Sequence, residues 1–389
     1  MLYNLLQIMD SWLDDMGFIK LVMVLYQLEF RAFFAVVFSF MLVLLFGKRT
    51  IAFLRRQKIG DAPEFYNADV NRLMESKAAT PTMGGVLIVG SMLLTILLFA
   101  DLTERYVHLA LIVLLWLAAV GGADDWLKLT SARRHPGSRE GLYAWEKLLF
   151  QLGIGFVAGF FLYRHGMSYE AGHVLNLPLQ RTYVPKSEGL VLEQGVIVLG
   201  MMAFVLIATM LIAGTSNAVN LTDGMDGLAA GTMIVASFAM MALCFIAGQA
   251  EAAQTLMFPY LPGAKELMVV TGAMAGACLG FVWFDCAPAQ VFMGDTGSLA
   301  LGGLLAYIAV AIRQEVLLII IGAVYFMEMG SVMLQVGYFK WTKGKRIFRC
   351  SPIHHHFHLG GWSEQQVVTR FWVLAMVFAM LALVSIKLR

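Results

Sequence analysis

Charged residues are scarce in this chain. Asp, Glu, Lys and Arg make up 14% of its 389 residues, whereas soluble domains contain about 25%. Apolar residues reach 59% and gather in long blocks such as 33–46, 84–100 and 371–386. A helix needs about 20 mostly apolar residues to cross a bilayer, where bare backbone groups find no water. The composition therefore predicts an all-α, polytopic integral membrane protein.

Other absences exclude further classes of protein. The net charge of +2 gives no reason to expect a nucleic-acid partner. No Gly-x-x-x-x-Gly-Lys-[Ser/Thr] or Gly-x-Gly-x-x-Gly motif occurs, so a nucleotide would not bind in a P-loop or a Rossmann turn. No cleavable signal peptide is expected, because Asp10, Asp14 and Asp15 interrupt the N-terminus. The four cysteines lack disulfide or metal-ligand spacing and are expected to be isolated thiols: Cys244, Cys278, Cys286 and Cys350.

About ten apolar segments are candidates for membrane spans. We expect one transmembrane domain over residues 1–389, with residues 1–30 as a periplasmic or interfacial segment. The ten spans would place both termini on the same side. They lie near 31–48, 84–100, 106–123, 145–164, 194–213, 228–248, 266–284, 298–312, 315–339 and 366–387.

Basic residues set the expected orientation. Most of the 28 Lys and Arg residues fall in the loops that follow the odd-numbered spans, and such loops are usually cytoplasmic. Both termini are then periplasmic. The same loops hold most of the Asp, Asn and His motifs, which predicts chemistry at the cytoplasmic face of the membrane. These loops lie near 49–83, 121–147, 214–227, 285–297 and 340–366.

Two adjacent carboxylates, Asp124 and Asp125, end the third span. Their mutual repulsion and partial desolvation disfavour the charged forms, and a metal ion or a cationic group would relieve this. The alternative is a solvated helix end anchored by Trp126 and Lys128. The motif alone leaves both interpretations open.

A polar stripe precedes the sixth span. If the segment is helical, Asn217, Asn220 and Asp223 follow one another at i, i+3 and Asp226 continues the same face. A turn at a helix start would explain Asp223-Gly224 but not the whole stripe. We therefore favour a site for a ligand with several hydroxyl or amide groups.

Asp295 lies among small residues in the segment 292–298, just before the eighth span. Such residues let backbone N–H groups and a carboxylate approach a phosphate–metal pair closely. An ordinary helix N-cap is the alternative, and the two are compatible.

Two further segments carry candidates. His354, His355 and His356 follow one another in the most basic loop; we expect an irregular segment with one or two of the three pointing inward. Phosphate binding or proton transfer fits them better than zinc, although a solvated His cluster remains an alternative. Lys77 and Thr82 precede the second span, where Lys77 is either a phosphate ligand or an interfacial anchor.

These motifs, in this order, resemble the polyprenyl-phosphate N-acetylhexosamine-1-phosphate transferase superfamily, and within it the bacterial phospho-N-acetylmuramoyl-pentapeptide transferases. The resemblance extends from about residue 30 to the C-terminus. Its segments are TPTMGG at 80–85, GADDWLK at 122–128, NAVNLTDGMDGLA at 217–229, PAQVFMGDTGSLALGG at 288–303 and the region 345–357, which includes SPIHHHF.

The resemblance implies a reaction and its partners. Phospho-N-acetylmuramoyl-pentapeptide would pass from its UDP conjugate to undecaprenyl phosphate in the membrane, releasing UMP and forming lipid I for peptidoglycan synthesis. It also implies Mg²⁺ as cofactor and a homodimer. A sister enzyme that transfers another sugar phosphate is the nearest alternative, and the His triplet argues against it. A transporter is a more distant one, because the polar residues gather at one face and no repeat is visible.

The resemblance also implies residue roles. Asp124 and Asp125 match the essential pair near the lipid phosphate, and Asp295 matches the magnesium ligand. Lys77 and His354 are the other catalytic candidates. Asp285 departs from the Asn that is usual in the family, which leaves its own role open. The expected substrate-binding residues are Thr82, Lys128, Asn217, Asn220, Asp223, Asp226, Phe292, His355 and His356.

Overall fold

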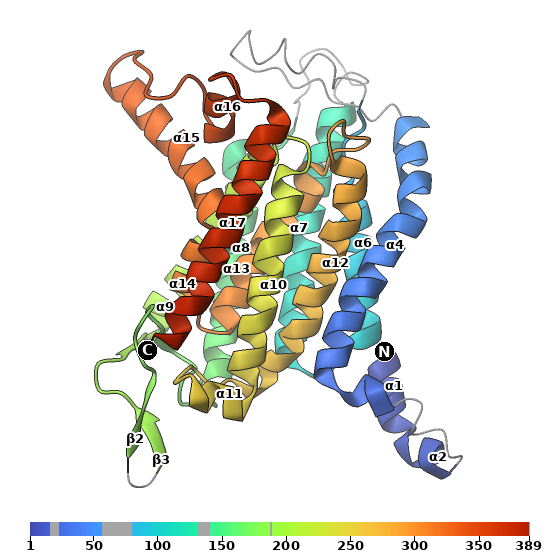
Figure 1. Cartoon of the computed structure of the whole chain (residues 1–389), viewed down its shortest axis with the longest axis vertical. Helices are drawn as coiled ribbons and strands as arrows, with labels where there is room; N and C mark the ends of the chain where they lie inside the picture. Colours follow the sequence, from blue (N-terminus) through green and yellow to red (C-terminus); the bar gives the residue numbers. More distant parts are fainter. Residues whose placement is uncertain (16–22, 57–79, 131–140, 187–188, 389) are drawn as a thin grey trace.

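The protein is a bundle of long helices that pack side by side, roughly along the long axis of the molecule (Figure 1). The computed structural model describes residues 1–15, 23–56, 80–130, 141–186 and 189–388. The all-α, polytopic class predicted from the composition is confirmed. Lys77 lies outside the described residues.

Among the described residues, eight helical segments are long and apolar enough to cross a membrane. They are α4 (Leu28–Arg56), α7 (Arg105–Thr130), α8 (Ala144–Gly166), α9 (Met201–Thr222), α10 (Leu228–Gly248), α12 (Leu267–Asp285) with the preceding 3-10 turn η4 (Pro262–Glu266), α13 (Gly294–Ala311) and α17 (Glu364–Lys387).

Two further elements fall where spans were predicted. Helices α14 (Glu315–Ile321) and α15 (Ala323–Trp341) meet at a bend of 83° and make a ninth span if they are counted as one. Helix α6 (Gly85–Phe99) is apolar but has only 15 residues. The helices thus coincide with the ten predicted segments, while the number that cross the membrane stays a prediction.

Helix α13 forms the centre of the bundle, and nearly all of its residues are buried. Its small residues allow close packing against α7 and α9. A Cβ on Gly302 would lie 2.6 Å from the Thr215 carbonyl oxygen of α9. The N-terminus of α13, which carries Asp295, is therefore held firmly between its neighbours.

One end of the bundle carries both chain termini and two small antiparallel sheets (Figure 1). Strand β1 (Val174–Leu175) pairs with β4 (Ile197–Val198), and β2 (Tyr183–Lys186) pairs with β3 (Gly189–Leu192). The sequence analysis anticipated no strands here. They are too short to leave the alternating pattern by which strands are recognised.

The described residues among the first thirty lie at that same end. They form α1 (Leu2–Ile8), α2 (Asp10–Asp15), the 3-10 turn η1 (Met23–Tyr26) and the start of α4. Arg31 of α4 forms a buried ion pair with Glu266, at 2.7 Å, and its guanidinium lies over the Tyr3 ring. The short helix α11 (Ala250–Thr255) lies at this end too.

Candidate active site

The Asp-Asp motif lies on a helix rather than in a loop, because α7 continues to Thr130. Both carboxylates are buried. Asp125 accepts hydrogen bonds from the Thr296 N–H at 2.9 Å, from the Thr296 hydroxyl at 2.6 Å and from the Asp295 N–H at 3.1 Å. These donors belong to the first turn of α13, whose free N–H groups favour an anion. Asp125 thus joins α7 to α13.

Asp295 completes a compact group of carboxylates. Ligand oxygens of Asp124, Asp125 and Asp295 all lie within 4.8 Å of one another. One Asp295 oxygen accepts a hydrogen bond from the Asn220 side-chain amide at 2.8 Å. Helices α7, α9 and α13 therefore bring three separate sequence motifs to one place.

Two lysines balance part of this charge. The Lys147 ammonium lies 2.7 Å from Asp124 and 2.6 Å from Asp295, so it bridges the two carboxylates. Lys128 lies 2.7 Å from Asp124 and 3.4 Å from Asp295. Lys128 was a candidate from the sequence, whereas Lys147 was not. Its position at the start of α8 is typical of an interfacial anchor, and only the packing of α8 shows that it points inward.

The cluster has the chemistry of a divalent metal site. Three carboxylates face two ammonium groups, so the balance is negative, and carboxylate oxygens are the ligands that hard divalent cations prefer. The Lys147 ammonium already occupies a cationic position between Asp124 and Asp295. The buried aspartate cluster could therefore hold a metal ion.

Thr82 and Phe292 lie in two segments that pair beside the cluster. The Phe292 N–H donates to the Pro81 carbonyl and the Gly84 N–H donates to the Phe292 carbonyl, both at 2.8 Å. Gly294, at φ +73°, packs so closely that a Cβ there would lie 2.8 Å from an Asp125 carboxylate oxygen and 2.9 Å from the Thr82 hydroxyl. The Thr82 hydroxyl is therefore near Asp125.

The polar stripe is only partly as predicted. Helix α9 ends at Thr222, so Asp226 lies in the following turn and does not continue the helical face. Asn217 donates to Gln151 at 2.6 Å and to the Ala213 carbonyl at 2.8 Å, which ties α8 to α9. Asn220 is the member of the stripe that contacts Asp295.

Asp223 follows directly after α9 and is electrostatically linked to the cluster. Burial, together with the neighbouring carboxylates of Asp295 and Asp125, raises the pKa of Asp223 to about 7, while a hydrogen bond from the Gly294 N–H opposes the shift.

The turn after Asp223 is held by other carboxylates. Asp226 accepts from the Ala289 N–H at 3.0 Å, and its own N–H donates to Glu364. Asp285 accepts from the Gly227 N–H at 3.1 Å. In this structure Asp285 therefore stabilises a backbone turn, which the sequence alone had left open.

The His triplet is helical, so the prediction of an irregular segment was wrong. Its three residues lie within α16 (Ile353–His358). His354 and His355 are buried, as predicted for one or two of the three. His356 accepts a hydrogen bond from the Arg349 N–H at 3.1 Å. The ring of His354 faces Gly224, because a Cβ there would lie 2.6 Å from its Nε2.

Two buried polar residues of α15 were missed by the sequence analysis. Glu328 lies 3.1 Å from the Nδ1 of His354. Gln335 accepts from the N–H groups of Ile347 and Phe348 and donates to the Phe348 carbonyl. Glu328 and Gln335 are seven residues apart and therefore lie on the same face of an otherwise apolar helix. This pattern of polar residues could have identified them from the sequence.

Comparisons with known proteins match two segments of this chain to family models. A family model described as glycosyl transferase family 4 matches residues 107–313, which include Asp124, Asn220 and Asp295. A signature described as phospho-N-acetylmuramoyl-pentapeptide-transferase signature 1 matches residues 77–89.

Two curated relatives carry the same name over nearly their whole length. The phospho-N-acetylmuramoyl-pentapeptide-transferase of Desulfotalea psychrophila is 42% identical over 364 residues, which cover 92% of this chain and 93% of that protein. The corresponding protein of Oleidesulfovibrio alaskensis is 40% identical over 371 residues, which cover 95% and 97%. The chain therefore belongs to the phospho-N-acetylmuramoyl-pentapeptide-transferase family.

Proposed function

We propose that the cluster of Asp124, Asp125 and Asp295 is the active site of a phospho-N-acetylmuramoyl-pentapeptide transferase. The enzyme transfers this phosphosugar from its UDP conjugate to undecaprenyl phosphate. The products are UMP and lipid I, the first lipid-linked intermediate of peptidoglycan. The observation that carries the proposal is that three separate motifs meet at one buried cluster of carboxylates.

Lys128 and Lys147 are proposed to bind phosphate oxygens of the substrates. Phosphoryl transfer depends mainly on positioning and on neutralising charge. Lys128 and Lys147 reach the carboxylates from α7 and α8, so both ammonium groups are placed to exchange a carboxylate partner for a phosphate oxygen. Lys77, outside the described residues, is proposed for the same task.

Magnesium is the proposed metal, held by Asp295 with Asp124 and Asp125 beside it. When bound, it would neutralise charge on the diphosphate bridge of the nucleotide. Asn220 donates to one Asp295 oxygen, which fixes the carboxylate and leaves its other oxygen toward Lys147.

The remaining candidates are proposed to bind the substrates. We assign Asp223 and Asn220 to the sugar or the nucleotide, Phe292 to stacking on the uracil, and Thr82 to a phosphate oxygen. His354 borders the site through Gly224. Asn217 and Asp226 act through the elements that they hold, because Asn217 ties α8 to α9 and Asp226 holds the turn that follows α9.

Direct attack of the lipid phosphate is the proposed course of the reaction. A phosphate monoester loses its second proton near about pH 6, so at neutral pH the acceptor needs little help from a base. Asp124 and Asp125 then mainly orient the reacting groups. Incubation with labelled nucleotide substrate and no lipid tests this, because a phosphosugar trapped on an aspartate would overturn it.

The proposed location is the bacterial inner membrane, with the cluster facing the cytoplasm and both termini in the periplasm. The multiple apolar helices establish only a multi-pass membrane protein. The homodimer implied by the family resemblance stays a prediction.

Release of UMP by the purified protein tests the activity. The assay compares UDP-N-acetylmuramoyl-pentapeptide with UDP-N-acetylglucosamine, each with and without Mg²⁺ and with undecaprenyl phosphate. We expect release only with the muramoyl-pentapeptide nucleotide and the metal. Equal release from UDP-N-acetylglucosamine would favour the sister enzyme.

A further inference from the structure

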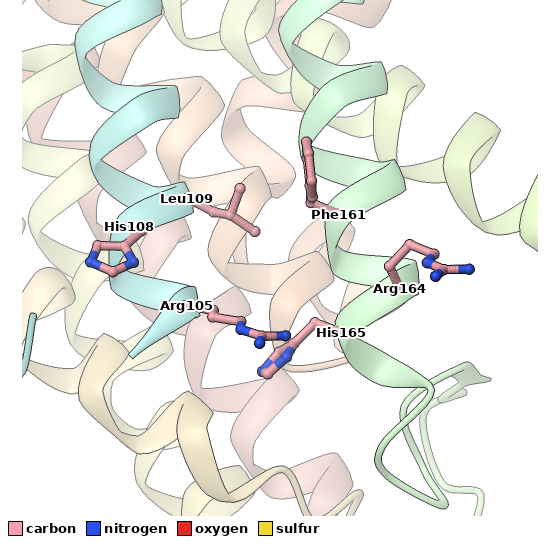
Figure 2. Close-up of a pocket in the computed structure, with 6 residues that line it drawn as sticks. All are labelled: Arg105, His108, Leu109, Phe161, Arg164 and His165. Carbon is pink, nitrogen blue, oxygen red and sulfur yellow. The ribbon is translucent and has the colours of Figure 1, made fainter. Parts of the chain in front are cut away.

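A cavity of about 430 Å³ lies between the first turns of α7 and the last turns of α8. It is about 28 Å along α7 from Asp124, so it is separate from the active site. Figure 2 shows Arg105 and His165 facing each other across the gap between the two helices. The residues that line the cavity are Arg105, His108, Leu109, Phe161, Arg164 and His165.

The cavity is electropositive and holds no anion of its own. In the part of the chain that the structure describes, no carboxylate lies within 4.0 Å of the Arg105 or Arg164 guanidinium. The neighbouring Glu104 points elsewhere, with its carboxylate against Gly263. The first turn of α7 carries no acidic residue.

An apolar surface leads away from these cations. On α7, Leu109, Ile112 and Trp116 follow Arg105 at helical spacing, and the latter two are exposed. On α8, Phe161 and Val157 precede His165 in the same way and are also exposed. The two faces meet where the Trp116 indole donates to the Phe150 carbonyl at 3.1 Å. The resulting track is about 16 Å long.

We propose that this cavity binds the phosphate ester of an anionic phospholipid, with an acyl chain along the track between α7 and α8. Guanidinium groups bind phosphate oxygens in a bidentate manner. A free phosphate would use the cations but leave the apolar track exposed, whereas a lipid satisfies both. The site lies at the end of the bundle that carries both termini, away from the aspartate cluster.

Lipid retention by the full-length protein tests this site. The protein is reconstituted with phosphatidylglycerol or with phosphatidylcholine of the same chains, extracted, and examined by native mass spectrometry. The double variant Arg105→Gln/Arg164→Gln should retain phosphatidylglycerol at least several-fold less than the wild type, with phosphatidylcholine unchanged. The matched control Arg181→Gln/Lys265→Gln removes two exposed cations that do not line the cavity.

The outcomes are distinguishable. Equal retention of phosphatidylglycerol by the double variant and the control would overturn the site. Displacement of phosphatidylglycerol by inorganic phosphate would overturn the lipid assignment in favour of a free anion. UMP release by the double variant should match that of the wild type, which shows that the variant is folded.

A different observation concerns Glu328, which is fully buried in α15. Its Oε2 lies 3.1 Å from the Nδ1 of His354, which is also fully buried. Among the described residues, neither ring nitrogen of His354 makes an aligned hydrogen bond, so the 3.1 Å contact of Nδ1 with Glu328 is an electrostatic one. The Nε2 faces the turn at Gly224, next to Asp223. The carboxylate therefore lies on one side of the ring and the active-site turn on the other.

We infer that Glu328 is a positioning residue for His354. A carboxylate beside Nδ1 favours the tautomer that carries its proton there, which leaves Nε2 as the functional atom. His356, by contrast, is engaged in holding the Arg349 backbone. This inference rests on the proposed function, because it assumes that His354 serves the reaction.

A double-mutant cycle tests the inference. Glu328→Met should lower kcat by about tenfold or more with little change in the KM for the nucleotide, whereas Glu328→Gln, which keeps an acceptor, should recover most of the loss. In the His354→Ala background, Glu328→Met should have no further effect, because residues that act as a unit are not additive. Glu315→Met, at another buried glutamate, should act additively with His354→Ala.

Two failures are separable. Full activity of His354→Ala would refute the role of that histidine in the proposed function. A slow His354→Ala enzyme together with a fully active Glu328→Met enzyme would refute only the positioning role.

Discussion

Asp295 is the residue on which the polar contacts of the site converge, with Asn220 at one oxygen and Lys147 at the other. Asp295→Asn preserves the shape of the side chain but removes its charge. We expect turnover to fall by on the order of 10²-fold or more, since electrostatic groups of this kind contribute that much to catalysis. UMP release at saturating magnesium measures the effect.

The matched control for that variant is Asp101→Asn at the other end of the bundle. Asp101 accepts hydrogen bonds from Thr103 and Asn4 and has no part in the cluster. It should leave turnover within about twofold of the wild type. Near-normal rates for Asp295→Asn at high magnesium would contradict the assignment.

Removing the charge of Lys147 should change the affinities for the metal ion and for the nucleotide in opposite directions. Lys147→Met removes an ammonium that lies within 2.7 Å of two carboxylates, so the cluster becomes more negative. A divalent cation should then bind more tightly and the nucleotide diphosphate more weakly. We expect the magnesium concentration for half-maximal activity to fall several-fold while the KM for the nucleotide rises.

Steady-state UMP release over a grid of magnesium and nucleotide concentrations separates these two effects. Lys265→Met, an exposed cation at the opposite end, serves as the control and should change neither quantity. An increased magnesium requirement in Lys147→Met would show that Lys147 supports the metal site instead of competing with it.

At the scale of elements, α15 holds the basic segment before the His triplet. The buried Gln335 satisfies two N–H groups and one carbonyl of residues 347–348. Gln335→Leu would remove these three part-buried hydrogen bonds, each worth about 0.5–1.5 kcal/mol. We expect faster amide exchange over residues 345–358 and a roughly tenfold lower turnover.

Hydrogen–deuterium exchange by mass spectrometry is the measurement for this variant. Val336→Leu alters the adjacent, exposed position on the other face of α15 and is the control. Unchanged exchange over residues 345–358 in Gln335→Leu would show that α16 (Ile353–His358) is held by its other contacts alone.

The positions of the helices were predicted from the sequence more accurately than the residues at which they end. Apolar runs located the helices, but α7 continues through Asp124 and Asp125 to Thr130, and α9 continues to Thr222. Hydropathy reports where a helix leaves the lipid, whereas backbone hydrogen bonds decide where it stops. The polar last turns are stabilised by tertiary partners such as Thr296, which no local pattern contains.

The site was predictable to the extent that its residues form motifs. Asp124, Asp125 and Asp295 stand out because carboxylates beside apolar spans are costly unless they are used. Lys147 was missed because a lysine at a helix end is common, and its direction depends on how α8 packs. Asp226 was placed on the wrong surface because α9 ends before it.

At the scale of the whole molecule, the bundle separates two chemistries. One end carries the aspartate cluster, Lys128, Lys147 and helix α16 with the His triplet. The other end carries both termini, the small sheets and the cationic cavity between α7 and α8 (Figures 1 and 2). This polarity, together with the basic loops, is the basis for the proposed orientation.

Thiol labelling tests that orientation. Cys286 lies at the cluster end and is exposed, whereas Gln194 is exposed at the end with the termini. Because the cluster should face the cytoplasm, a membrane-impermeant maleimide applied to spheroplasts should label Gln194→Cys at once and Cys286 only after permeabilisation. A Cys286→Ser/Cys350→Ser background removes the native signal at the cluster end, and labelling of Cys286 in sealed spheroplasts would reverse the topology.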